Sequence, residues 1–216
     1  MILDQFEMVV IGAAITAVLM AGSSQLRVNL TLYSIETLLI GLATALTAHT
    51  QGEPGLYWIA LGISAVKGIA IPAFLAWTID RIKIHSDTGT IMAAPLAMHL
   101  SIILLGLSYL FVLGLPVPAS DVRGWPGATA AISLVFSGLV LMLTRRVAIS
   151  QIVGFLVLEN GIYLFALTQT KGMPMIVEMG VLLDVLVGVM IAGLLVFKIQ
   201  HSFEHIDVTQ LTELKD

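Results

Sequence analysis

Long apolar stretches alternate with short polar ones along the whole chain. Each stretch holds roughly 20 mostly apolar residues, which is the length that an α-helix needs to cross a bilayer core. The connections between them are polar or rich in Gly and Pro, and none is long enough to form a separate soluble domain. The pattern predicts an all-α membrane protein with about seven transmembrane helices. These predicted spans cover residues 3–22, 27–48, 56–80, 91–114, 126–144, 148–169 and 175–199.

The composition supports residence in a membrane. Of the 216 residues, 58% are hydrophobic and 11% are charged, and the mean hydropathy is +1.00. Soluble domains carry roughly 25% charged residues. The chain has no cysteine, which excludes disulfides and thiolate-bound metal or iron–sulfur centres on this chain. No basic stretch favours nucleic acid as a partner, and we expect no cofactor.

The basic residues are divided unequally between the loops on the two sides of the predicted bundle. Because cytoplasmic loops carry an excess of Lys and Arg, the richer side is expected to face the cytoplasm. The N-terminus then lies outside and the C-terminus inside. Asp4 and Glu7 stand where a secretory signal would carry basic residues, so the first span is expected to be retained. The richer side holds Arg27, Arg81, Lys83, Arg145, Arg146, Lys198 and Lys215, and the other holds Arg123 and Lys171.

The first three spans and the last three are alike in plan. In each set the second helix carries one glutamate near mid-depth, Glu36 and Glu159, and the third carries one ionisable residue, Lys67 and Asp184. The pattern predicts two parallel three-helix repeats joined by a fourth span. We expect a first repeat at 1–81, a connecting span with its loops at 82–125, a second repeat at 126–200 and a cytoplasmic tail at 201–216.

Ionisable residues at mid-depth are the strongest functional signal in the sequence. A charge at the centre of a membrane helix costs ~2.5–3.5 kcal/mol on insertion scales. Glu36, Lys67, Glu159 and Asp184 all lie roughly ten residues into their spans, and His99 has a similar place in the fourth. Desolvated carboxyl and amino groups can exchange protons near neutral pH. We interpret these residues as a proton relay, with polar cross-links between helices as the alternative.

Two tyrosines accompany the glutamates. Tyr33 precedes Glu36 by three residues, and Tyr163 follows Glu159 by four. Residues three or four apart share a face of a helix, so each tyrosine can support the carboxylate on its own helix.

Two further positions carry weaker signals. Pro72 lies inside the third span and frees the carbonyl of Gly68, which predicts a kink and a bound water next to Lys67. Glu178 lies at the outer start of the seventh span, where it is either a solvated helix-start acid or the external mouth of a proton path. His201 to His205 match the H-x-x-E-H pattern of some zinc peptidases, but the chain offers no evident third ligand. We therefore expect neither a metal site nor a catalytic site on this chain.

The last third of the chain is similar to a known family. Residues 145–147 read Arg-Arg-Val, 154–161 read Gly-Phe-Leu-Val-Leu-Glu-Asn-Gly, and 184–188 read Asp-Val-Leu-Val-Gly, with a related tail at 206–215. These segments resemble component E of hydrogenase-4, a membrane subunit of formate hydrogenlyase-type group 4 NiFe hydrogenases. The resemblance runs along nearly the whole chain. The last three spans also resemble the K subunit of bacterial respiratory complex I and the C subunit of multisubunit cation/proton antiporters.

The resemblance implies roles for particular residues. Glu159 and Asp184 match the two membrane glutamates of the K subunit that are linked to proton transfer. In the first repeat Glu36 matches the first glutamate, but Lys67 stands where the second would be, so that half is not a second copy of the same relay. The implied partners are antiporter-like and hydrogenase-module subunits of a bacterial inner-membrane complex that moves protons or sodium. The alternatives are a self-sufficient secondary transporter and a structural scaffold.

Overall fold

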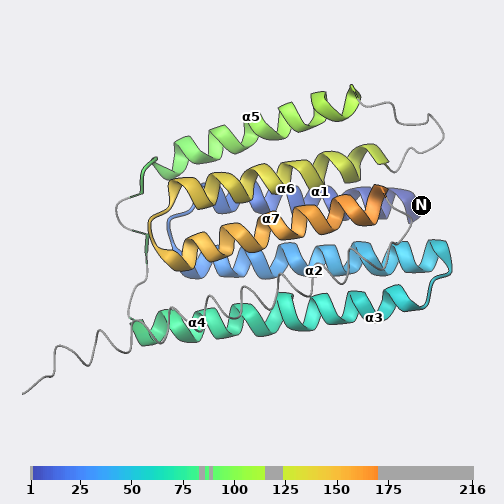
Figure 1. Cartoon of the computed structure of the whole chain (residues 1–216), viewed down its shortest axis with the longest axis horizontal. Coiled ribbons are helices and arrows are strands. Elements are labelled where there is room, and N and C mark those ends of the chain that lie inside the picture. Colours follow the sequence, from blue (N-terminus) through green and yellow to red (C-terminus); the bar gives the residue numbers. More distant parts are fainter. Residues whose placement is uncertain (1, 83–85, 88–89, 115–123, 170–216) are drawn as a thin grey trace, which may run out of the picture.

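The computed structural model describes residues 2–82, 86–87, 90–114 and 124–169, and within them the regular structure is helical (Figure 1). The third predicted span is one continuous rod of α3, a π-helix η1 and α4. The other helices each correspond to one predicted span. Their bounds are α1 Ile2–Ala21, α2 Leu26–Gln51, α3 Gly55–Gly62, η1 Ile63–Ala70, α4 Ile71–Ile82, α5 Ala94–Leu113, α6 Gly124–Thr144 and α7 Ala148–Gln169.

The prediction of an all-α membrane protein is confirmed. Among the described residues, five helical segments are long and apolar enough to cross a membrane, and residues 5–21 of α1 form a shorter apolar helix. The seventh predicted span, 175–199, lies outside the described residues. The five segments are Leu26–Gln51, Gly55–Arg81, Ala94–Leu113, Trp125–Thr144 and Ala148–Gln169.

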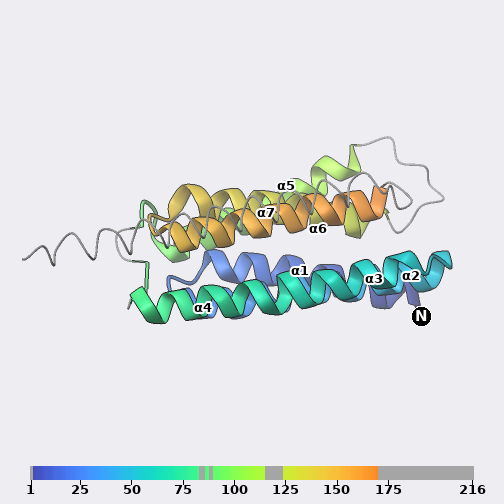
Figure 2. The same cartoon turned by 60° about the horizontal axis from the view of Figure 1, so that its bottom comes forward.

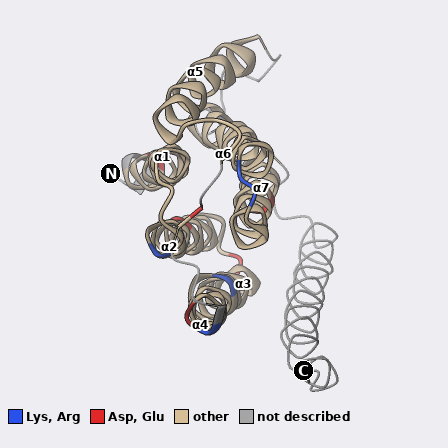
Figure 3. Cartoon of the chain, turned by 90° about the vertical axis from the view of Figure 1, so that its left-hand side faces the viewer, with Lys and Arg blue, Asp and Glu red and all other residues tan. Residues whose placement is uncertain are grey.

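Four helices, α1, α2, α6 and α7, enclose the main core. The rod of α3, η1 and α4 packs on α2 at one edge, whereas α5 packs on α6 and α1 at the other (Figures 2 and 3). Fully buried side chains such as Tyr33, Leu134 and Leu156 fill the centre. The outer faces expose large apolar side chains, including Trp58 at 76% and Leu110 at 63%. Such faces suit contact with lipid or with other membrane helices.

The described basic loop residues gather at one end of the bundle. The α1–α2 and α6–α7 connections and the end of α4 meet there, at the left in Figure 1. Arg27 forms an exposed ion pair with Asp80, and Arg81 lies over the ring of Trp77. Arg146 is exposed, whereas Arg145 is buried. The side of the membrane that this end faces stays a prediction.

Helices α6 and α7 approach until their backbones touch. A Cβ atom built on Gly138 would lie 2.6 Å from both the Gly154 oxygen and the Leu158 nitrogen. One built on Gly161 would lie 2.7 Å from the Ala131 oxygen. Small residues permit this close packing of membrane helices, in which van der Waals contact replaces the hydrophobic effect.

This contact predicts that Gly138→Ala destabilises the bundle. The added methyl group meets backbone atoms that cannot move independently, and overpacking of this kind costs about 1–3 kcal/mol. The measurement is SDS-induced unfolding of the purified protein in mixed micelles. Gly106→Ala in α5 is the matched control, because a Cβ there meets nothing within 4 Å. Equal stability of the two variants would contradict the close approach.

Candidate functional site

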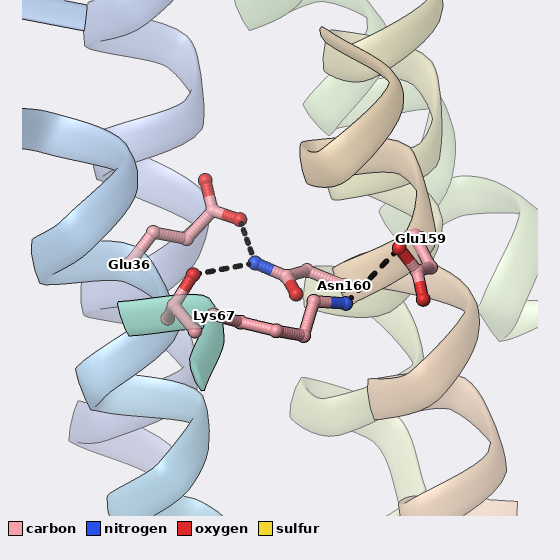
Figure 4. Close-up of polar contacts among 5 residues, drawn as sticks. Glu36, Lys67, Glu159 and Asn160 are labelled. Carbon is pink, nitrogen blue, oxygen red and sulfur yellow. Dashed lines mark hydrogen bonds and ion pairs between the residues drawn. The ribbon is translucent and has the colours of Figure 1, made fainter. Parts of the chain in front are cut away.

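Three of the predicted ionisable residues come together between α2, η1 and α7. Lys67 on η1 extends toward α7, where its Nζ lies 3.1 Å from Oε2 of Glu159 (Figure 4). Both side chains are almost completely buried, with 7% and 4% exposed. Glu36 on α2 is fully buried and lies within the electrostatic range of Lys67. Residues far apart in sequence thus form one buried polar cluster.

Asn160 joins the two sides of this cluster. Its Nδ2 donates hydrogen bonds to Oε1 of Glu36 at 3.0 Å and to Oγ1 of Thr37 at 2.9 Å (Figure 4). Both amide protons of Asn160 are therefore used on α2. Glu159, its neighbour in sequence, pairs with Lys67 on η1. Consecutive residues of α7 thus contact two different elements.

Lys67 lies on the π-helix η1, which ends just before Pro72. Pro72 has no N–H group, so the turn before it cannot close in the ordinary α-helical way. The N–H of Ile71 instead donates to Val66, five residues earlier. The Gly68 carbonyl, where we expected a bound water, accepts a hydrogen bond of 2.7 Å from the Ser34 hydroxyl on α2. π-Helical segments inside α-helices are rare, and they are frequently found at functional sites.

The two predicted tyrosines have different surroundings. The Tyr163 hydroxyl lies 3.1 Å from Oγ1 of Thr44 on α2. Because the Thr44 hydroxyl donates to the Ile40 oxygen at 2.8 Å, the tyrosine is the donor of this pair. Tyr163 thus links α7 to α2 through Thr44. Tyr33 is fully buried on α2 in the turn preceding Glu36.

The remaining predicted residues are not part of the described cluster. His99 is exposed on α5, with its Nδ1 2.6 Å from the backbone oxygen of Pro95. Since α5 packs on α6 and α1, His99 lies on a different side of the bundle. Asp184 and Glu178 lie outside the described residues. The relay roles of all three stay predictions.

A second buried polar network surrounds Arg145 at the end of the bundle. Its Nη2 donates to the backbone oxygens of Ala21 and Ser23, both at 2.8 Å, and its Nη1 donates to the Ser24 hydroxyl at 3.2 Å. The guanidinium thus caps the C-terminus of α1, where carbonyl groups lack helical partners. Burial lowers the pKa of Arg145, and the nearby Asp87 opposes that shift.

Sequence reasoning missed Asn160 and the burial of Arg145. A signal for Asn160 was present, because an amide directly after a mid-span glutamate must also find partners. Arg145 looks like any other loop charge, since nothing local separates it from the exposed Arg146. Among the described residues, no group of three or more His, Asp or Glu side chains is placed to hold a metal ion.

Comparisons with known proteins identify relatives along nearly the full length. The chain is 29% identical over 212 residues to an uncharacterized protein of Mycobacterium tuberculosis, covering 95% of this chain and 93% of the relative. It is 25% identical over 203 residues to hydrogenase-4 component E of Escherichia coli K12, covering 93% of each chain, and equally similar to that of Shigella flexneri.

The chain is a distant homologue of hydrogenase-4 component E. No family model matches the sequence, and no solved structure matches the fold. The similarity of the last spans to the K subunit of complex I stays a prediction.

Proposed function

We propose that this protein is a non-catalytic integral membrane subunit of a multisubunit, complex I-like NiFe hydrogenase. Its buried ionisable residues would contribute to proton or cation translocation coupled to electron transfer elsewhere in the complex. The homology to hydrogenase-4 component E along 93% of both chains supports membership of such an assembly. The buried contact between Lys67 and Glu159 is the observation that supports an ion-handling role.

The ion pair supports function over scaffolding for an energetic reason. Desolvating two charges can cost more than their attraction returns, and well-packed apolar residues in their place are often neutral or stabilising. Lys67 and Glu159 lie inside helices whose other buried residues are mainly apolar. A group that only joined helices could be an amide or a hydroxyl, as Asn160 and Thr44 are here.

The wider assignment extends beyond the described residues. We place the protein in a bacterial inner membrane, with a periplasmic N-terminus and a tail, 201–216, packed on a cytoplasmic neighbour. Its proposed partners are antiporter-like and hydrogenase-module subunits of a formate hydrogenlyase-type complex. In the second repeat Glu159 and Asp184 are the proposed relay pair, Glu178 the external entrance, and His99 a contributor from the connecting span.

Amide variants test the proposed relay. Glu159→Gln and Asp184→Asn keep size and polarity but cannot carry a transferable proton near neutral pH. Both are expected to lower proton movement per electron severalfold in vesicles that contain equal amounts of assembled complex. Asp184→Glu is the matched control, and it should retain more activity than Asp184→Asn because it keeps the acid. Full pumping by both amide variants would refute the relay.

Two alternatives give different results in related experiments. A self-sufficient transporter would move ions when the chain is reconstituted alone, whereas the proposed subunit requires its partners. A scaffold would lose assembly in the amide variants, whereas a relay would lose coupling and remain assembled.

A further inference from the structure

The charges of the buried cluster do not balance when every group is ionised. Glu36 and Glu159 supply two carboxyl groups, and Lys67 supplies one ammonium group. All three are buried by the surrounding helices. We propose that the cluster holds one proton on Glu36, while Lys67 and Glu159 form the ionised pair. The assignment deepens the proposed translocation role, because it names the acid that carries the exchangeable proton.

Net charge provides the first argument. With both acids ionised the described cluster carries one excess negative charge inside a membrane helix bundle. An uncompensated buried charge is strongly unfavourable, and a buried ionisable group commonly becomes neutral instead. A single added proton brings the net charge of Glu36, Lys67 and Glu159 to zero.

Geometry decides which acid holds that proton. Oε2 of Glu159 lies 3.1 Å from the Lys67 ammonium, so this carboxylate has a counter-ion in direct contact. The hydrogen bond to Glu36 comes from a neutral amide, the Asn160 Nδ2, and reaches Oε1. The other carboxyl oxygen of Glu36, Oε2, is buried and accepts no hydrogen bond from the described residues. A carboxylic acid fits this environment better than a carboxylate, because Oε1 can be the carbonyl that accepts from Asn160.

The other groups around Glu36 leave this assignment intact. Among the described residues, the ionisable side chains of this region are Lys67 on η1, Glu159 on α7, and Tyr33 in the preceding turn of α2. Tyr163, farther along α7, donates a hydrogen bond to the Thr44 hydroxyl. Lys67 is therefore the cation of the described cluster, and it is in contact with Glu159.

Infrared spectroscopy of the full-length protein in lipid nanodiscs at neutral pH can count the protons. The parent should show a protonated carboxyl C=O band that shifts in D₂O. Glu36→Gln should lose the intensity of one such group. Lys67→Met should gain the intensity of one further group, because both acids must then be neutral. Unchanged intensity in either monodisperse variant would overturn the proposal.

A matched pair of conservative variants locates the proton. Glu36→Asp should shift the band, because the protonated acid itself is altered, whereas Glu159→Asp should leave the band in place. If only Glu159→Asp shifted the band, the proton would lie on Glu159, and the assignment to Glu36 would be overturned. These measurements need neither partner subunits nor turnover. Failure here would therefore leave the pumping test of Glu159 and Asp184 unaffected, and failure of that test would leave the proton on Glu36 unaffected.

Discussion

Replacing Arg145 with methionine is expected to destabilise the protein by about 3–5 kcal/mol, the range measured when one partner of a buried charged network is removed. The change deletes three hydrogen bonds, to Ala21, Ser23 and Ser24, and leaves their oxygens without that donor. It also removes the positive charge that faces Asp87. The loss should appear as a large reduction in the SDS fraction needed to unfold the purified protein in mixed micelles.

Arg146→Met is the control for this experiment. It removes the same charge one residue later, but from an exposed side chain, so a change below about 0.5 kcal/mol is expected. Arg145→Lys should lie between the two variants. An ammonium group keeps the charge but lacks the planar fork that reaches two carbonyl groups at once. Equal effects at positions 145 and 146 would contradict a structural role for the buried guanidinium.

Lys67→Met is expected to combine a stability loss of about 3 kcal/mol with loss of coupling in the assembled complex. The variant leaves Glu159 buried without the ammonium group that now lies 3.1 Å away. The double variant Lys67→Met with Glu159→Leu should recover most of the stability, because an apolar pair of similar volume carries no desolvation cost. It should not recover proton movement per electron. Stability is measured by SDS-induced unfolding and coupling in vesicles.

The exposed pair of Arg27 and Asp80 provides the control. Both side chains are more than half exposed, so Arg27→Met should cost at most about 1 kcal/mol. If the double variant at Lys67 and Glu159 pumped like the parent, the pair would not be part of the translocation path. One that was no more stable than the single variant would show that the pair is not energetically coupled.

Most of the helical architecture could be predicted from the sequence. Membrane helices hydrogen-bond their own backbones, so an apolar run of sufficient length specifies a span before any packing is known. Predicted spans such as 27–48 and 148–169 therefore agree with α2 and α7 to within a few residues. Glu36, Lys67 and Glu159 could also be identified as candidates, because all three were predicted near the middle of their spans, where charges are rare.

The partners of the candidate residues could not be predicted in the same way. Depth does not specify which face of a helix meets which neighbour. The sequence predicts a depth for His99 like that of Glu36, yet His99 is exposed on α5. The π-helix was missed because Pro72 indicates only that one α-helical hydrogen bond is lost. The freed Gly68 carbonyl accepts a hydrogen bond from Ser34 on α2, a partner that the local sequence does not reveal. Arg145 was read as a loop charge because its partners lie more than 120 residues earlier.

The glycine contact between α6 and α7 has a mechanical consequence. Because Gly138 and Gly154 bring the two backbones into direct contact, we expect these helices to move together. We expect relative sliding to be easier between α7 and α2, which are joined by polar contacts at Asn160 and Tyr163. A small shear there would lengthen the contact between Lys67 and Glu159, which straddles η1 and α7. A partner that displaced the α6–α7 pair is therefore expected to alter the charges of the cluster from a distance.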